Sequence, residues 1–226
     1  MERVFFCWSG GKDSALALYE IIQSQTYEVV SLLSTVTEDY DRVRMHGVPR
    51  VLLERQADCL GLPLEVVHIP KNCSTEEYGV RMQETLTRFK QDGVSLVVFG
   101  DVFLEDVREY RENNLARIEM RAVFPLWGRD TAELAQSFVT LGFEAIITCI
   151  DSRVLDNRFI GRTIDDLLLS ELPPGVDPCG ENGEFHSFVL NGPIFKERVA
   201  CALGEVVLRD SFYFCDLAQK ETAITK

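Results

Sequence analysis

Short apolar runs alternate with amphipathic stretches through the first half of the chain. Runs rich in β-branched and aromatic residues predict strands at Arg3–Trp8, Glu28–Val36, Leu64–Ile69 and Ser95–Gly100. Between them, apolar residues at helical spacing predict helices over Ser14–Ser24, Pro49–Leu60 and Thr75–Gln91. Because strands that alternate with helices form parallel sheets, we expect a doubly wound, mainly parallel α/β sheet. Its ligand should lie beyond the carboxyl ends of the strands, near the topological switch point.

The pattern changes after about Arg121. The second half predicts helices at Asp130–Leu141 and Ile164–Glu171, and strands at Ala145–Ile150, Phe185–Leu190, Val199–Leu208 and Ser211–Cys215. The last two strands are expected to form a hairpin around Arg209-Asp210. We therefore expect residues 1–122 to form one domain and residues 123–226 a second, smaller α+β domain packed against it.

A polar hexapeptide, Ser9-Gly10-Gly11-Lys12-Asp13-Ser14, separates the first strand from the first helix. Two glycines let the backbone approach an anion, the helix N-terminus offers N–H groups and partial positive charge, and Lys12 adds a full charge. The Walker pattern is excluded because Asp13 follows Lys12, and the dinucleotide pattern because the glycines are adjacent. The alternative is an ordinary strand-to-helix turn that binds no ligand, with Asp13 or Ser14 as the helix N-cap.

The hexapeptide, called the glycine loop below, resembles the pyrophosphate loop (PP-loop) of the ATP pyrophosphatase superfamily. Members of that superfamily split ATP between its α and β phosphates. The resemblance implies a nucleotide-binding fold of the HUP type for residues 1–122, with ATP held by residues 9–14.

A second polar segment, the acidic loop at residues 177–187, reads D-P-C-G-E-N-G-E-F-H-S. In an extended chain Glu184 and His186 project to the same face, and Glu181 approaches that face if the Asn182-Gly183 turn folds back. The alternative is a polar turn that opens a hairpin, since Asn-Gly is a common turn signal. Together with the glycine loop, this segment resembles the diphthine–ammonia ligase family, and the similarity spans nearly the whole chain. The chain resembles the short form of the family.

The resemblance implies an enzyme that uses ATP to adenylate a substrate carboxylate and then lets ammonia displace AMP, leaving an amide. Lys12, Asp13, Glu181, Glu184 and His186 are then the candidate catalytic residues. Asp13 and Asp101 are the candidate contacts for Mg²⁺. The nucleotide is expected to contact Ser9, Gly10, Gly11, Lys12, Asp13, Ser14, Leu33, Ser34, Met45, Gly100 and Asp101. The acceptor would be diphthine on elongation factor 2 if the host makes it, and otherwise a small carboxylate.

Composition and charge indicate the partners and the cellular compartment to expect. The 226 residues are 46% hydrophobic and 26% charged, and the net charge of −13 argues against a protein that depends on nucleic-acid phosphates. Seven cysteines are scattered without paired spacing, and we see no signal peptide or apolar run of membrane length. We expect a cytoplasmic protein with reduced thiols and no membrane partner; a homo-oligomer is compatible with the sequence.

Two rival functions stay open at this level. One is a tRNA-modifying PP-loop enzyme, although paired catalytic cysteines and an RNA-binding extension are not evident. The other is a nucleotide-binding sensor without turnover. Cys179 is interpreted as a small loop residue rather than a nucleophile, and Arg108 and Arg111 as a solvated helix face with i,i+4 pairs.

Overall fold

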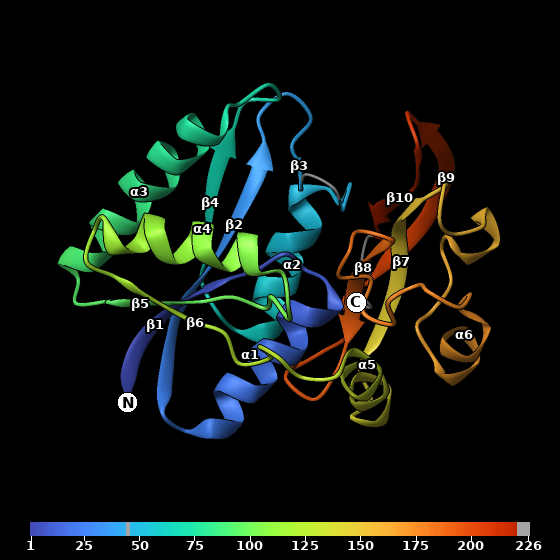
Figure 1. The fold of residues 1–226 in the computed structure, drawn as a ribbon, viewed down its shortest axis with the longest axis horizontal. Coiled ribbons are helices and arrows are strands. Elements are labelled where there is room, and N and C mark those ends of the chain that lie inside the picture. Colours follow the sequence, from blue (N-terminus) through green and yellow to red (C-terminus); the bar gives the residue numbers. More distant parts are fainter. Residues whose placement is uncertain (44–45, 221–226) are drawn as a thin grey trace, which may run out of the picture.

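The computed structural model describes residues 1–43 and 46–220, and Figure 1 shows its α/β architecture. In chain order the first part contains β1 (Glu2–Cys7), α1 (Lys12–Ser24), β2 (Tyr27–Thr37), β3 (Arg42–Val43), α2 (Arg50–Leu60), β4 (Leu64–Ile69), α3 (Thr75–Gln91), β5 (Leu96–Val98), α4 (Glu105–Ala116) and β6 (Arg121–Val123). β1 pairs in parallel with β2 and β5, β2 with β4, and β5 with β6. Only the short β3 is antiparallel, on the end of β2.

This pairing confirms the doubly wound sheet. The chain adds β2 and β4 on one side of β1 and then crosses to β5 and β6 on the other, so the topological switch point lies between β1 and β5. The glycine loop follows β1 and Gly100-Asp101 follows β5, at neighbouring carboxyl ends. The pattern did not predict β3 and β6, because strands of two or three residues are too short to show a period.

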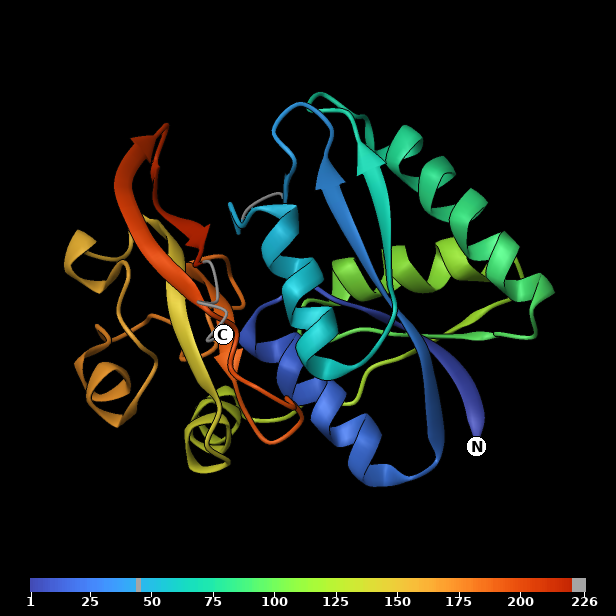
Figure 2. The same cartoon turned by 180° about the vertical axis from the view of Figure 1, so that it is seen from behind.

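Helices cover both faces of this sheet. α1 and α2 lie on the face that is in front in Figure 2, and α3 and α4 on the face in front in Figure 1. Leu16 of α1 and Leu53 of α2 belong to one buried cluster, whereas Leu86 of α3 and Leu115 of α4 belong to another. In α1, α2 and α3 the inward residues recur at helical spacing, which is the pattern that predicted these three helices. The pattern did not predict α4, whose one buried residue is Leu115; it was expected only as a solvated helix face around Arg108 and Arg111.

The second part is built around an antiparallel sheet. Its elements are α5 (Thr131–Thr140), β7 (Glu144–Asp151), a 3₁₀ turn (Asn157–Phe159), α6 (Asp166–Glu171), β8 (Phe185–Asn191), β9 (Cys201–Arg209) and β10 (Phe212–Gln219). The strand order is β8-β7-β10-β9, with every neighbouring pair antiparallel. The hairpin around Arg209-Asp210 is confirmed, and Asp210 takes the left-handed conformation at its tip (φ 54°).

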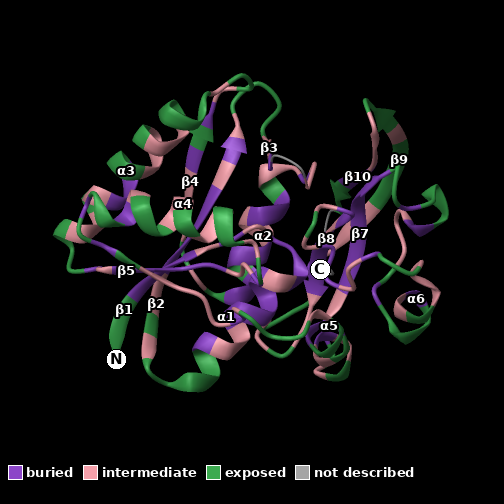
Figure 3. Cartoon of the chain, viewed as in Figure 1, coloured by how far each residue is buried: buried purple, intermediate pink, exposed green. Residues whose placement is uncertain are grey.

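One buried cluster joins the two parts. It contains Phe6 of β1 and Leu53 of α2 from the first part, and Ile147 of β7 and Phe188 of β8 from the second. Figure 3 shows this buried zone running from β1 through α2 to β7. Because the two sheets share a core, the segment before β8 is held against the carboxyl edge of the first sheet. Within the described residues, no helix is long and apolar enough to span a membrane.

Candidate active site

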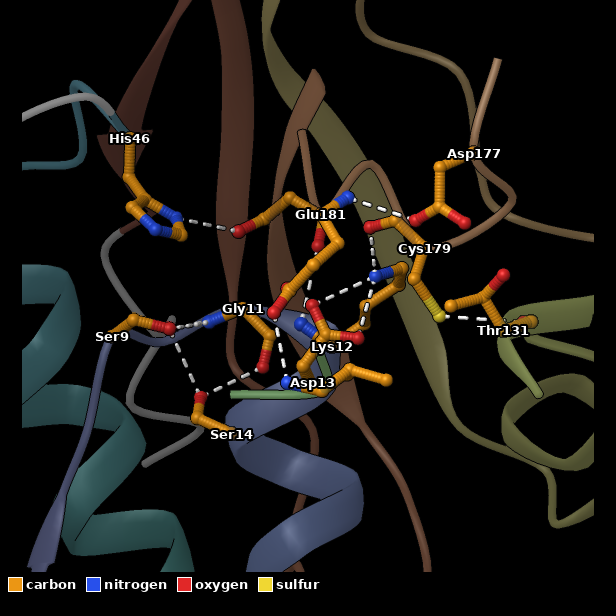
Figure 4. A network of polar contacts seen from close by, with 12 residues as sticks. Ser9, Gly11, Lys12, Asp13, Ser14, His46, Thr131, Asp177, Cys179 and Glu181 are labelled. Atoms are coloured by element: carbon orange, nitrogen blue, oxygen red, sulfur yellow. Dashed lines mark hydrogen bonds and ion pairs between the residues drawn. The ribbon is translucent and has the colours of Figure 1, made fainter. Parts of the chain in front are cut away.

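A cavity of about 480 Å³ opens at the carboxyl ends of β1, β2 and β5, a size typical of small-ligand sites. Its wall combines the glycine loop with α3, α4 and the acidic loop. The lining residues are Cys7, Trp8, Ser9, Gly11, Lys12, Asp13, Ser14, Leu33, Thr35, Val43, His46, Tyr78, Met82, Phe99, Gly100, Asp101, Arg111, Cys179, Gly180, Glu181, Phe185, His186 and Ser187. The structure therefore brings the two polar segments of the sequence into one site (Figure 4).

Helix α1 begins differently from α3, α5 and α6. Each of those three starts on a Ser or Asp whose side chain accepts a bond from a helix N–H. α1 starts at Lys12 after Gly11, which has no side chain to cap it, so neither Asp13 nor Ser14 is the N-cap. The caps come from elsewhere: Gly11 N–H donates to Ser9 Oγ (3.2 Å) and Lys12 N–H to Ser187 Oγ (3.1 Å). Hydroxyl oxygens thus lie at N–H groups that the sequence predicted to be unpaired.

Gln56 of α2 fixes the path of the glycine loop. Its fully buried amide donates to the carbonyls of Gly10 (3.0 Å) and Val189 (2.6 Å) and accepts from Trp8 Nε1 (2.9 Å). Gly10 has φ +81°, and a Cβ there would meet Gln56 Oε1 at 2.8 Å and Leu53 Cδ2 at 2.9 Å. Glycine is therefore required at position 10 by both backbone conformation and space. Gly10 itself supports the loop and does not line the cavity.

The Lys12 amine is almost fully buried, with its side chain 3% exposed. It donates to both carboxylate oxygens of Asp13 (2.6 and 2.7 Å) and to the carbonyl of Cys179 in the acidic loop. Burial is the largest single influence and lowers the Lys12 pKa. The charge of Asp13, its hydrogen bond to Lys12, and the nearby Cys179 and Glu181 together outweigh burial, so the pKa is raised and the amine stays charged. The cavity thus contains a fixed positive charge at the start of α1.

Cys179 supports the loop through its backbone. Burial raises the pKa of its thiol to about 12, more than the nearby Lys12 charge lowers it. Its Sγ lies 3.4 Å from the carbonyl of Thr131. A thiol that stays protonated is a poor nucleophile, in agreement with the interpretation of Cys179 as a small loop residue.

The acidic loop separates its two glutamates. Glu184 is 5% exposed and lies outside the cavity wall; its Oε1 accepts from Asp177 N–H and from Asn182 Nδ2, both at 3.0 Å. Asp177 in turn accepts from Glu181 N–H (2.9 Å). Glu184 therefore holds the loop closed, while Glu181 lines the cavity. Glu184 and His186 do not share a face, because the chain turns at residues 182–184 before β8 begins.

Glu181 reaches across to the first sheet, where its Oε1 accepts from Val102 N–H (2.8 Å). Burial raises the pKa of Glu181 to about 7; the Val102 N–H opposes this, and the negative charges of Asp13 and Asp101 add to it. A carboxyl group that titrates near neutral pH is suited to proton transfer under physiological conditions.

His186 faces a second histidine, with 4.8 Å between the ring centroids of His186 and His46. Burial, assisted by His46 and Lys12, lowers the His186 pKa to about 3. The His46 pKa is also lowered, mainly by burial, and its Nδ1 lies 3.1 Å from the carbonyl of Ser187. Both rings are therefore neutral at physiological pH. His186 Nε2 is buried without a hydrogen-bond partner in the described part of the chain, so it is free to bond a ligand.

Arg111 corrects an expectation. It was expected on a solvated helix face, but it lines the cavity with its guanidinium 4.3 Å from the centre of the Phe99 ring. Its Nη2 donates to Asp101 Oδ1 (3.1 Å). Arg108 does make the expected i,i+4 pair, with Glu112 at 2.8 Å. The signal for Arg111 is its spacing: buried Leu115 lies four residues later on α4, so both residues fall on the inner side of the helix.

Of the other residues expected to contact the nucleotide, some line the cavity and others do not. Leu33 and Gly100 line the cavity, whereas Ser34 is buried outside its wall and donates to the carbonyl of Trp8 (2.6 Å). Met45 lies outside the described residues. Among the described residues, no group of three or more His, Cys, Asp or Glu side chains is arranged to hold a metal ion. Asp13 and Asp101 both line the cavity, each paired with a cationic side chain.

Comparison with known proteins matches both parts of the chain. Residues 2–122 match the model of the diphthamide synthase N-terminal domain and residues 130–222 that of its C-terminal domain. The Diphthine--ammonia ligase of Danio rerio is 27% identical over 94% of this chain and 91% of its own length, and that of Homo sapiens 25% over 96% and 89%. The Schizosaccharomyces pombe protein of the same name is 28% identical, but the match covers only 38% of it.

Among solved structures, the U34-tRNA thiolase NcsA from Methanococcus maripaludis shares 15% identity and a TM-score of 0.39, over 62% of this chain and 58% of that one. This likeness is too low to support an inference. The family models instead cover nearly all of the 226 residues, with one boundary between residues 122 and 130. The resemblance carried by the glycine loop and the acidic loop is confirmed: the chain belongs to the diphthamide synthase family.

Proposed function

We propose that this chain is an ATP-dependent amide ligase that adenylates a substrate carboxylate and then transfers the acyl group to ammonia. One observation carries the proposal: the acidic loop closes over the glycine loop, with Ser187 and Cys179 bonded to the backbone and amine of Lys12. A phosphate-binding loop and a proton-transfer carboxyl, Glu181, therefore share one cavity. The name that the curated relatives bear, Diphthine--ammonia ligase, supports this reading.

In the first step, an oxygen of the acceptor carboxylate attacks the α-phosphorus of ATP. The bond from the α-phosphorus to the bridging oxygen breaks, and pyrophosphate leaves with the electron pair. The glycine loop is placed to hold the departing phosphates, and the fixed charge of Lys12 to stabilise them. Leu33, Gly100 and His46, which also line the cavity, would contact the nucleoside.

Magnesium fits this cavity as a partner of ATP. Asp13 and Asp101 offer hard carboxylate oxygens, and Mg²⁺ commonly takes one or two such ligands while the rest come from phosphates and water. Bound there, it would offset charge on the triphosphate. We propose Asp13 and Asp101 as its protein contacts; in the structure these carboxylates pair with Lys12 and Arg111.

In the second step, ammonia attacks the acyl carbon of the adenylate, and AMP leaves with the electrons of the acyl–oxygen bond. The attacking nitrogen must lose a proton, which Glu181 can accept because its pKa of about 7 leaves it ionised at slightly alkaline pH. His186, with a pKa of about 3, is too weak a base for this step. Its role would be to orient ammonia or the acceptor through the buried Nε2.

The proposed acceptor is diphthine on elongation factor 2 where the host makes it, and another carboxylate where it does not. The experiment measures AMP and pyrophosphate release from ATP with the acceptor, with and without ammonium. Amide formation that requires ATP, the acceptor and ammonium together supports the proposal. ATP binding without AMP release would favour a sensor, and AMP release that depends on tRNA would favour a tRNA-modifying enzyme.

Two variants sharpen the assay. Glu181→Gln should slow amide formation at least 100-fold, while Glu109→Gln, an exposed glutamate on α4, should behave as the wild type. Glu184→Gln separates a structural from a chemical role, because the hydrogen bonds of the Glu184 side chain stay within its loop in the described structure. We expect it to lower thermal stability more than the rate measured on the folded fraction.

A further inference from the structure

The Arg111–Asp101 pair on the cavity wall is incompletely bonded. Both side chains are largely buried, with 29% of Arg111 and 14% of Asp101 exposed. Arg111 Nε lies 2.8 Å from Asp101 Oδ2, but the geometry is not that of a hydrogen bond, so both atoms are buried without one among the described residues. Asp101 therefore occupies the Nε–Nη2 edge of the guanidinium as an ion pair. In the described part of the chain Nη1 makes no hydrogen bond, so Nη1 is the donor left for a ligand that enters the cavity.

Charge balance shows what kind of ligand Arg111 suits. Among the described residues of the cavity wall, the cationic side chains are Lys12 and Arg111. Lys12 belongs to the glycine loop, where the phosphates of ATP are proposed to sit. Arg111 comes from α4, beyond the carboxyl end of β5. The proposed reaction brings a second anion, the acceptor carboxylate, against the triphosphate, and two anions approach only if a cation offsets their repulsion.

We propose that Arg111 is the residue that binds the acceptor carboxylate and so determines that the substrate is an acid. The inference rests on the proposed function. A planar guanidinium with five N–H donors matches a carboxylate through two parallel hydrogen bonds, whereas Lys12 is a point charge suited to phosphate. Asp101 and the face of Phe99 hold the guanidinium in place before the substrate arrives.

The surroundings of Arg111 fit an organic acid better than a further phosphate. Tyr78, Met82 and Phe99 line the cavity beside it, and a recess of about 40 Å³ continues from them between α3 and α4. That recess has room for a small group of the substrate. A carboxylate on Arg111 would have its carbon chain against apolar side chains and one oxygen directed toward the nucleotide.

The test separates binding of the acceptor from binding of ATP. Arg111→Gln should raise the KM for the diphthine-bearing elongation factor by about 10- to 100-fold, as expected for loss of a charge-assisted bidentate contact. Arg111→Lys keeps the positive charge but loses the two parallel N–H donors of the guanidinium, so it should raise the KM for the acceptor by a smaller factor. Calorimetric Kd values for ATP without acceptor should stay within about twofold of the wild type. Arg108→Gln, one turn earlier on α4, is the matched control and should change neither quantity.

Each outcome decides the inference. If Arg111→Gln weakens ATP binding and leaves the acceptor KM unchanged, Arg111 is a nucleotide contact and the inference fails. If the wild type forms no AMP with the acceptor, the proposed function fails and the inference fails with it. Circular dichroism and thermal melts establish whether both Arg111 variants fold. If the glutamine variant does not fold, the lysine variant takes its place in the test, because it keeps a positively charged partner for Asp101.

Discussion

Replacing Glu181 by Gln should stabilise the protein at alkaline pH. The wild-type carboxyl has its pKa raised from 4.5 to about 7, mainly by burial, so the folded state binds its proton more tightly than the unfolded state does. A group of this kind contributes stability below its unfolded pKa and loses it as the pH rises through the folded pKa. A glutamine has no proton to lose, and its amide oxygen can still accept from Val102 N–H.

The size of the effect follows from the two pKa values. Each pH unit between 4.5 and about 7 contributes about 1.4 kcal/mol, which sets an upper limit of about 3.5 kcal/mol. Glu181 is not fully buried, and solvent reduces the cost of its charge. We therefore expect the glutamine variant to gain about 1–2.5 kcal/mol relative to the wild type between pH 5 and pH 8.

Urea unfolding followed by circular dichroism at pH 5, 6, 7 and 8 measures this difference. Comparing wild type and variant at each pH removes the contribution of the other titrating groups. The control is Glu109→Gln on the exposed side of α4, whose stability difference should not change with pH. The reasoning is refuted if Glu181→Gln is no more stable than the wild type at pH 8, or if its advantage is the same at pH 5. A variant that is more stable but inactive would indicate that the cavity keeps this carboxyl for chemistry.

Three further predictions concern the cavity and its support. Lys12→Ala should reduce AMP formation by about 100- to 1000-fold while weakening calorimetric ATP binding far less, because the charge acts mainly on departing pyrophosphate; equal losses would contradict this. Gln56→Leu removes three buried hydrogen bonds and should lower the free energy of unfolding in urea by about 2–4 kcal/mol. Its control, Gln136→Leu, removes a single exposed bond to Asp166 and should lower it by about 0.5 kcal/mol or less. The pH profile of kcat/KM should have its midpoint near pH 7, the pKa of Glu181, and level off above about pH 8. His186→Gln should show the same rise, since His186 has a pKa of about 3 and stays neutral; loss of that rise in the histidine variant would identify His186 as the base.

Much of the first sheet and its ligand edge follows from local sequence. The strand β1, the glycine loop and α1 are contiguous, so apolar pattern, glycine and helix start together predict the turn. The helix α3 was predicted with its observed bounds because apolar residues such as Leu86 recur at helical spacing; the structure adds that Ser74 caps its start. The strands β3 and β6 were missed because each has only two or three residues.

The contacts inside the site depend on distant segments. Ser187 bonds Lys12 across 175 positions of the chain, and Gln56 bonds Val189 across 133. No local pattern distinguishes Glu181 from Glu184, yet one lines the cavity and the other closes its loop. Arg111 was misassigned because its charged neighbours suggested an exposed helix, although its spacing from Leu115 points inward.

The sequence by itself determined the fold class, the family and the position of a phosphate-type loop at the end of the first strand, because these depend on short-range patterns of burial, glycine and charge. Only the tertiary structure decided which polar groups share the cavity and how each is protonated. The reason is physical: the pKa values of Glu181 and His186 and the pairing of Arg111 with Asp101 depend on burial and on charges contributed by segments far apart in the chain.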